Sequence, residues 1–466
     1  MQRYGRLAAL LALYLTIVYL VPRPETVDPQ GWRFFGIFMA VIVGMMIQPL
    51  PGAALVIVGL TAATLNGTPI RDALGGFSEP SVWLVLAAML MARVLMETGM
   101  ARRLALLFIR QFGSSSLGVG YALVFTDVTL AGGVPSITAR SAGMVMPVGR
   151  SIAELFDSRP GPTASRLGTY LFVTMYQGSA VACAMFFTGQ ASNVLAASLA
   201  ADLVGLNVTW TSWFTAAVVP GLASCIAVPL VCYKLLTPEV RRTPEAAAFA
   251  REQLVAMGPM RRDELIALAV FVAVGLLWLT SGVHGLDVTF VALGCLAVLI
   301  LTGTLKWETA VSERSAWDVF IWYGGLLKMG QILNATGVTE AFAGAVGGLL
   351  SSVPWFPLLL ITLLIYFYTH YFFASITAHM LAMFPPFVVL VTSLGVPVPL
   401  AVYSLMCLAN LPAGLTHYGT TTGPILFSQD YVSFRDWWRA GFVMSVANMA
   451  IWLGLGFGWW KVLGLW

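Results

Sequence analysis

Residues 132–147 read Gly-Gly-Val-Pro-Ser-Ile-Thr-Ala-Arg-Ser-Ala-Gly-Met-Val-Met-Pro, and a tetrapeptide within them occurs twice in the chain. Ser136-Ile137-Thr138-Ala139 returns unchanged as Ser375-Ile376-Thr377-Ala378. A basic or titratable side chain follows each copy, Arg140 in the first and His379 in the second. The chain is therefore predicted to contain an internal repeat.

A second matching pair lies at almost the same offset. Leu95-Met96-Glu97-Thr98-Gly99 corresponds to Leu333-Asn334-Ala335-Thr336-Gly337. Two halves that carry matching small polar motifs inside apolar sequence are typical of a transporter whose site lies between structural repeats.

The composition places the chain in a lipid bilayer. Apolar residues make up 59% of the sequence and charged residues only 10%, whereas about 25% of a soluble domain is charged. The mean hydropathy is +0.84. Such a chain cannot present a normal hydrated surface, so the sequence predicts an all-α polytopic membrane protein.

Apolar runs long enough to cross a bilayer recur along the whole chain. A span needs about 20 apolar residues, and on that basis we predict about 11 transmembrane helices. They lie near residues 7–22, 33–49, 52–66, 82–97, 167–200, 211–235, 264–281, 288–304, 318–334, 399–428 and 440–466.

The two segments that hold the repeated tetrapeptide, 118–155 and 356–394, are interrupted at their centres. The interruptions are Gly132-Gly133-Val134-Pro135-Ser136 and Ala374-Ser375, so we predict two re-entrant hairpins. An odd number of predicted spans separates them, which makes the two repeats inverted, with one hairpin entering from each face. The predicted parts are an N-terminal span and outer loop (1–32), a first repeat (33–235), a linker (236–263) and a second repeat (264–466).

The distribution of basic residues orients this layout, because Lys and Arg accumulate on the cytoplasmic side of a membrane. Most of the 25 basic residues fall on the side of the N-terminus and the linker. The opposite side carries only Arg23, Arg33, Arg71 and Lys461. We therefore expect an integral protein of a bacterial inner membrane with a cytoplasmic N-terminus and linker.

The interruptions of the helices are the candidate binding site. Non-helical backbone survives within a membrane only where it is buried in protein or lines a wet cavity. The Ser and Thr of both repeated motifs, and the free N–H groups of the half-helices that follow, then face a cavity that favours anions. Arg140 and His379 are placed to add positive charge for a bound anion. The alternative is that the hydroxyls only cap and pack their helices.

A second interrupted segment follows each hairpin. In the first half it is Thr188-Gly189-Gln190-Ala191-Ser192-Asn193, and in the second it is Thr416-His417-Tyr418-Gly419-Thr420-Thr421-Thr422-Gly423-Pro424. Small hydroxyl residues and glycines let a backbone approach a ligand and offer neutral donors to a carboxylate. These segments add Thr188, Gly189, Ser192, Asn193, Gly419, Thr420, Thr421, Thr422 and Gly423 to the candidate residues.

Three further ionisable residues near membrane depth are functional candidates by default. Asp127 is expected to pair with a cation such as Arg140 or to cap backbone, since a carboxylate repels a dicarboxylate. For Lys328 the alternative is an extended side chain that reaches the cytoplasmic face, and for His417 it is a role in orienting the threonine-rich backbone. Neither the five cysteines nor the histidines have metal-ligand spacing, so we predict no metal, no cofactor and no nucleic-acid partner.

Several motifs together resemble a known family. The run Leu415-Thr416-His417-Tyr418-Gly419, the run Trp437-Trp438-Arg439-Ala440-Gly441-Phe442 and the paired Ser-x-Thr-Ala motifs resemble the divalent anion/sodium symporters. The nearest resemblance is to bacterial citrate/succinate and tartrate/succinate antiporters and plastid dicarboxylate translocators, over nearly the whole chain. It implies a homodimer of inverted-repeat protomers that work by an elevator movement. It also implies di- and tricarboxylate substrates such as succinate, malate, 2-oxoglutarate, tartrate or citrate.

The resemblance places substrate carboxylates at Ser136-Ile137-Thr138 and Ser375-Ile376-Thr377. In sodium-coupled members the central residue of each motif is an asparagine that helps to form a sodium site, and here both are isoleucines. An apolar side chain offers no oxygen to a hard cation. We therefore predict a sodium-independent exchanger. Sodium-coupled or proton-coupled symport is the alternative, and a passive anion channel is a weaker one. The sequence contains no metalloprotease helix and no phosphate-binding loop, so an enzyme is not expected.

Overall fold

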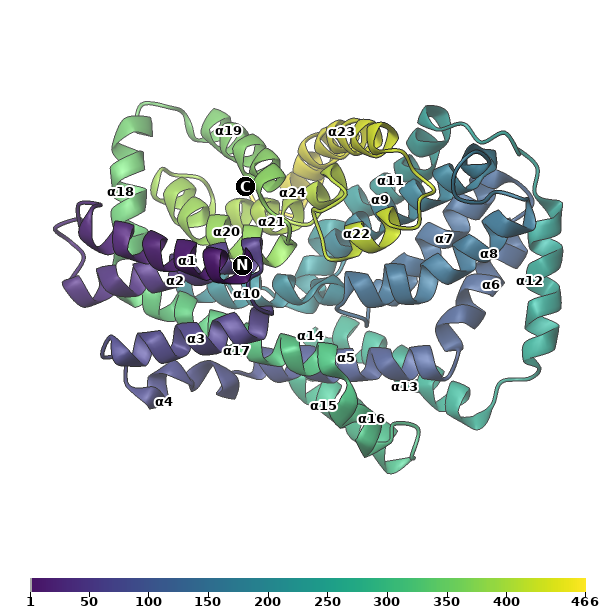
Figure 1. The fold of residues 1–466 in the computed structure, drawn as a ribbon, viewed down its shortest axis with the longest axis horizontal. Coiled ribbons are helices and arrows are strands. Elements are labelled where there is room, and N and C mark those ends of the chain that lie inside the picture. The colour runs from purple at the N-terminus through teal and green to yellow at the C-terminus, as the bar shows by residue number, and fades with distance from the viewer. Residues whose placement is uncertain (1) are drawn as a thin grey trace.

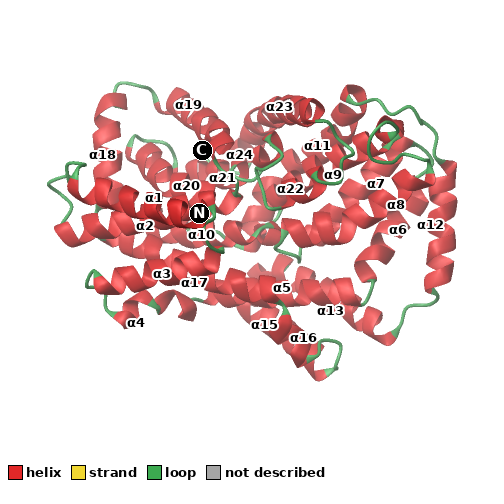
Figure 2. Ribbon diagram, viewed as in Figure 1, coloured by secondary structure: helices red, strands yellow, loops and turns green. Residues whose placement is uncertain are grey.

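The regular structure of the chain is helical. The computed structural model describes residues 2–466, and within them there are helices and an isolated β-bridge but no β-strand (Figure 2). Seven helical stretches in this part of the chain are long and apolar enough to cross a membrane. They are Pro29–Ile47, Pro80–Glu97, Trp210–Leu235, Trp355–Phe372, Ile376–Ser393, Val398–Leu415 and Phe434–Val462. The prediction of an all-α membrane protein is confirmed.

The first half of the chain contains eleven α-helices before the linker. They are α1 (Gln2–Tyr19), α2 (Pro29–Ile47), α3 (Gly52–Leu65), α4 (Ile70–Ala73), α5 (Pro80–Glu97), α6 (Met100–Phe112), α7 (Ser116–Ala131), α8 (Met146–Leu155), α9 (Gly168–Met185), α10 (Ala191–Val204) and α11 (Trp210–Leu235).

The linker and the second half supply the remaining helices (Figure 1). They are α12 (Pro244–Met257), α13 (Arg262–Leu279), α14 (Ser281–His284), α15 (Val288–Leu301), α16 (Trp307–Ser312), α17 (Arg314–Ala335), α18 (Val338–Leu350), α19 (Trp355–Tyr368), α20 (Ile376–Ser393), α21 (Val398–Leu408), α22 (Thr422–Phe427), α23 (Phe434–Ala450) and α24 (Phe457–Val462).

The helices break at both predicted hairpin tips. In the first half α7 ends at Ala131, and after a non-helical stretch a π-helical segment, Thr138–Val145, leads into α8. Pro135 lacks an N–H and disfavours helix in the residue before it, which accounts for the break. In the second half α19 ends in a 3₁₀ turn, Thr369–Phe372, and α20 begins again at Ile376.

The second repeated motif forms a sharp corner in each half. Gly99, between α5 and α6, has φ 82° and ψ 5°, and Gly337, between α17 and α18, has φ 74° and ψ 7°. Glycine adopts this left-handed conformation without steric cost, which explains why both copies end in Thr-Gly. The short helices that follow, α6 and α18, lie toward opposite ends of the molecule (Figure 1). Neither was among the spans predicted from the sequence.

The predicted linker contains the helix α12, which lies along the edge of the molecule (Figure 1). The chain beside it is tied back to α6 by a buried ion pair between Arg103 and Glu264, with two N–O distances of 3.1 Å. Arg102 adds a hydrogen bond of 2.8 Å to Gln253 of α12. The linker is therefore packed against the first half, while the domain boundaries and the inverted orientation of the repeats stay predictions.

Candidate functional site

One cavity of about 650 Å³ is lined by both copies of the repeated motif. Ser136, Ile137 and Thr138 reach it from the first hairpin tip, and Ser375, Ile376 and Thr377 reach it from the second. The rest of its wall comes from the α2–α3 turn, α5, the start of α10, the start of α17 and the threonine-rich segment. These residues are Met45, Gln48, Pro49, Leu50, Pro51, Gly52, Met89, Pro135, Gln190, Ala191, Ser315, Asp318, Val319, Trp322, Thr420 and Thr421.

The two serines cap the helices that start at the hairpin tips. Ser136 Oγ accepts a hydrogen bond of 3.2 Å from the backbone N–H of Ala139, and Ser375 Oγ accepts one of 3.4 Å from Ala378. The serine hydroxyls therefore do cap their helices, as the alternative interpretation of the sequence expected. A hydroxyl that accepts a bond still has its own O–H to donate, so capping and ligand binding are compatible.

Thr138 joins the first hairpin tip to the second half of the chain. Its Oγ1 lies 2.8 Å from Oγ1 of Thr421 and 2.9 Å from Oγ1 of Thr422. Thr420 Oγ1 in turn accepts hydrogen bonds of 3.1 Å from the backbone N–H groups of Thr422 and Gly423, which closes the turn that starts α22. Thr420 and Thr421 line the cavity, and Thr422 supports it through Thr138.

Gly419 and Gly423 allow the threonine-rich segment to fold closely onto itself. A Cβ at Gly419 would lie 2.5 Å from the carbonyl oxygen of Ala413, and one at Gly423 would lie 2.5 Å from that of His417. Backbone carbonyl oxygens therefore lie too close to either glycine for a side chain to fit. Neither glycine lines the cavity.

Replacing Gly423 by alanine is expected to destabilise the protein by about 1–3 kcal/mol, because a fixed backbone oxygen must move to admit the methyl group. Thermal unfolding in detergent would measure the change. Gly458→Ala is the matched control, since a Cβ at Gly458 of α24 has no neighbour within 4 Å. Equal melting temperatures for the two variants would contradict the tight turn.

Helix N-termini supply positive electrostatic potential to the cavity. The helical segments that begin at Thr138, Ala191 and Ile376 all start at residues of the cavity wall. Gln190, which precedes α10, makes no side-chain cap, so N–H groups in the first turn of α10 lack a side-chain partner there. Free N–H groups and the helix dipole favour anions at such positions.

Arg140 lies behind the first hairpin tip and outside the cavity wall. Its side chain is fully buried, and Nε lies 2.8 Å from Oδ1 of Asp127. Nη1 donates to the carbonyl oxygens of Val134 at 2.5 Å and Gly189 at 2.7 Å. Ser179 donates to the other oxygen of Asp127. The charge of Arg140 is thus matched by Asp127, as expected for that carboxylate. The guanidinium also ties the hairpin tip to the interrupted segment of the first half, residues 188–193.

His379 is also buried behind its hairpin tip. Its Nε2 lies 2.8 Å from the carbonyl oxygen of Tyr366, and its ring centroid lies 4.9 Å from that of His370. His370 Nε2 lies 2.9 Å from the carbonyl oxygen of Gly419. Each half therefore uses a buried basic side chain, Arg140 or His370, to hold a glycine carbonyl of its interrupted segment. Neither Arg140 nor His379 is placed to touch a ligand in the cavity.

The remaining candidate residues of the interrupted segment 188–193 stabilise its bend. Asn193 Nδ2 donates to the carbonyl oxygens of Cys183 at 2.8 Å and Phe186 at 3.0 Å. Thr188 Oγ1 donates to Gly132 O at 2.7 Å. Ser192 is buried beside them and, with Thr188, Gly189 and Asn193, lies outside the cavity wall.

His417 and Lys328 lie away from the cavity. His417 Nδ1 accepts a hydrogen bond of 3.2 Å from Nε1 of Trp438, and its role in orienting the threonine-rich backbone stays a prediction. Lys328 lines a separate cavity that also contains Asp28 and Asp72. Within residues 2–466, no group of three or more His, Cys, Asp or Glu side chains could hold a metal ion.

The sequence analysis missed the wall formed by the α2–α3 turn and the start of α17. Gln48 has a left-handed backbone, φ 47° and ψ 57°, at the end of α2. A non-glycine residue in this conformation is uncommon and points to a position constrained by its surroundings. The Pro-Leu-Pro sequence after it marks a turn, and Asp318 is an acidic residue at the start of a predicted span. Neither the turn nor the acidic residue indicates, from sequence alone, that its segment lines the cavity between the hairpin tips.

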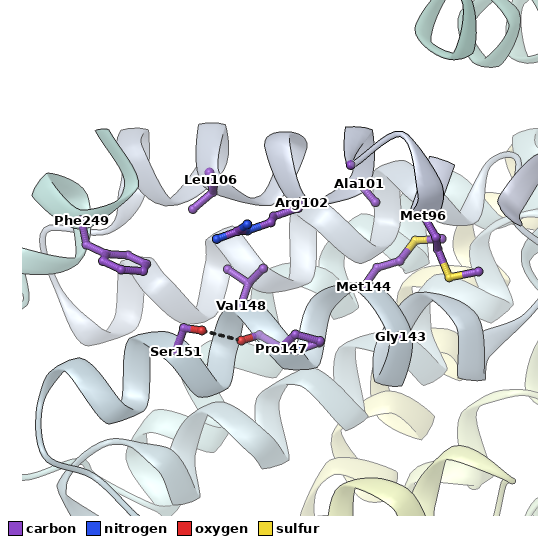
Figure 3. A pocket seen from close by; sticks show the side chains of 11 residues that line it. Met96, Ala101, Arg102, Leu106, Gly143, Met144, Pro147, Val148, Ser151 and Phe249 are labelled. Carbon is purple, nitrogen blue, oxygen red and sulfur yellow. Dashed lines mark hydrogen bonds between the residues drawn. The ribbon is translucent and has the colours of Figure 1, made fainter. Parts of the chain in front are cut away.

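A second cavity, of about 390 Å³, lies between α6, α8 and α12 (Figure 3). Phe249 lies at one end of it, Met96 and Met144 lie toward the other, and Arg102 lies between them. Its wall contains none of the repeated Ser and Thr residues. The cavity between the hairpin tips is therefore the better candidate for a small polar ligand.

Comparisons with known proteins agree with these features. The family model described as the sodium:sulfate symporter transmembrane region matches residues 2–466. The putative malate transporter YflS of Bacillus subtilis is 40% identical over 97% of this chain and 95% of its own length. The chloroplastic dicarboxylate transporter 1 of Arabidopsis thaliana is 42% identical over 97% of this chain and 82% of its own length. The inner membrane protein YbhI of Escherichia coli is 32% identical over 97% of this chain and 96% of its own length.

A solved structure shares the fold. The YdaH transporter of Alcanivorax borkumensis aligns with 99% of this chain and 98% of its own, with a TM-score of 0.53 at 13% sequence identity. At that identity the likeness concerns the fold alone. The resemblance noticed in the paired motifs is thus confirmed, and the relatives named as transporters agree with the expectation of a carrier rather than an enzyme.

Proposed function

Because this chain belongs to the sodium:sulfate symporter family, we propose that it carries small dicarboxylates across a membrane by exchange. The observation that supports this most is the cavity lined by both Ser-Ile-Thr motifs. Its wall contains the hydroxyls of several Ser and Thr residues and the starts of three helical segments, and such groups recognise carboxylates as a class. In this proposal one substrate carboxylate binds at each hairpin tip.

Succinate, malate and related acids are the proposed substrates. Two relatives are named for malate and for dicarboxylates, and the paired tips offer two equivalent sets of neutral donors. We further propose a homodimer in a bacterial inner membrane, a cytoplasmic N-terminus and an elevator movement, which follow from the family and from the basic residues.

Sodium independence is supported by the two isoleucines. Both side chains belong to the cavity wall and are only 2% exposed. Ile376 packs in an apolar cluster with Ala180 and Ala413. A sodium ion requires several oxygen ligands, and neither isoleucine side chain provides one.

Cation-coupled symport is the second candidate, and the burial of Arg140 and His379 favours it. No Lys, Arg or His is among the residues of the cavity wall. A dianion there must be balanced by helix N-termini alone or by a cation that travels with it. The charge argument for exchange is therefore weaker than the sequence suggested, and the argument from the isoleucines remains.

Uptake of labelled succinate into proteoliposomes separates these candidates. We expect uptake that requires internal dicarboxylate and is unchanged by a sodium gradient. Uptake into empty vesicles driven by sodium or by a proton gradient would contradict exchange. Flux that neither saturates nor responds to internal substrate would indicate a channel.

A further inference from the structure

The cavity between the hairpin tips has one ionisable side chain in its wall, and that side chain is acidic. Asp318, near the start of α17, is the residue. A carboxylate is an unexpected component of a dicarboxylate site, because like charges repel. Its presence therefore requires a reason other than charge attraction for the substrate.

Asp318 has no charged partner. The carboxylate is half-buried and lies near the backbone N–H of Ala53 at the start of α3. None of the ion pairs found within residues 2–466 includes Asp318. The side chain thus keeps the capacity to accept hydrogen bonds.

The hairpin tips and Asp318 belong to different parts of the cavity wall. If the two carboxylates bind at Ser136-Ile137-Thr138 and Ser375-Ile376-Thr377, the carbon chain spans the space between the tips. Substituents on that chain can then face the wall formed by α17 and the α2–α3 turn, where Asp318 and Gln48 lie.

We propose that Asp318 selects dicarboxylates that carry a hydrogen-bond donor on the carbon chain, such as a 2-hydroxyl group. The inference rests on the proposed dicarboxylate transport. The carboxylate accepts a hydrogen bond from the substrate hydroxyl, and hydrogen bonds to charged groups are the stronger ones. A substrate without a donor leaves the carboxylate unpaired, and a third substrate carboxylate meets a negative charge. Malate is therefore favoured over succinate, and tricarboxylates are disfavoured.

Competition against labelled succinate uptake in proteoliposomes tests the proposal on the unmodified protein. Malate is expected to inhibit at about tenfold lower concentration than succinate, the ratio typical of one hydrogen bond to a charged group. 2-Methoxysuccinate, which has the bulk but no donor, is expected to inhibit no better than succinate. Tricarballylate is expected to inhibit least. Equal inhibition by malate and 2-methoxysuccinate would overturn the role of a donor.

The variant Asp318→Asn removes the charge and keeps the shape. The malate preference is expected to fall to about twofold or less, and tricarballylate is expected to inhibit better. Asp202→Asn is the matched control, because Asp202 is exposed, bonds to Gln331 and lies outside the cavity wall. An unchanged malate preference in an active Asp318→Asn protein would overturn the proposal and leave dicarboxylate transport standing. Failure of the unmodified protein to take up any dicarboxylate would instead refute the proposed function.

Discussion

Replacing Arg140 by glutamine is expected to destabilise the protein by about 3–5 kcal/mol, the usual cost of leaving a buried charge without its partner. Asp127 is 2% exposed, and Arg140 is its charged partner at 2.8 Å. The variant also loses the bonds from Arg140 to Val134 and Gly189, so the guanidinium no longer joins the hairpin tip to the interrupted segment. Thermal unfolding in detergent and the yield of folded protein would measure the effect.

Two further variants separate charge from geometry. The double variant Asp127→Asn/Arg140→Gln removes both charges and is expected to recover part of the lost stability, because no unpaired charge remains. Arg140→Lys keeps the charge but loses the planar set of donors, and its stability is expected to lie between those of the unmodified protein and Arg140→Gln. A stable Arg140→Gln protein that no longer transports would contradict this role and would indicate that the guanidinium compensates the charge of the substrate.

Replacing Thr138 by valine is expected to weaken the apparent affinity for every dicarboxylate by about 10- to 100-fold. Valine has nearly the same shape but removes the hydroxyl that bonds to Thr421 and Thr422 in the cavity wall. The proposal assigns this hydroxyl to a substrate carboxylate, and a hydrogen bond to a charged group is worth about 1.5–3 kcal/mol. Thr377→Val, at the other tip, is expected to act in the same direction. The concentration of succinate that gives half-maximal exchange would be measured for each variant.

The control for these variants is another threonine that bonds within a helix. Thr392 of α20 donates only to the carbonyl oxygens of Val388 and Val389, and it lies outside the cavity wall. Thr392→Val is expected to leave the affinity unchanged, and Thr138→Ser, which keeps the hydroxyl, is expected to restore most of it. Unchanged affinity in both Thr138→Val and Thr377→Val would remove the hairpin tips from the binding site.

The sequence located the interruptions of the helices more reliably than the roles of the residues near them. Proline and glycine act on their own backbone, so the break at Pro135 could be predicted locally. Arg140 and His379 follow the motifs closely in sequence, so they were predicted to add positive charge to the cavity. The direction in which each side chain leaves its helix decides whether it reaches the cavity. A π-helical segment begins at Thr138 in the first half, and both basic side chains turn to buried partners instead.

Hydropathy, the repeated tetrapeptide and the paired Thr-Gly corners are properties of short stretches, and from them the sequence alone determined a helical membrane carrier with two matching interruptions. Tertiary structure decided which of the marked residues share a cavity. It brought Thr138 to Thr421 across the two halves and added Gln48 and Asp318 from segments with no repeated motif. The physical reason is that a cavity wall is made by side chains distant in sequence, whose meeting depends on how whole helices pack.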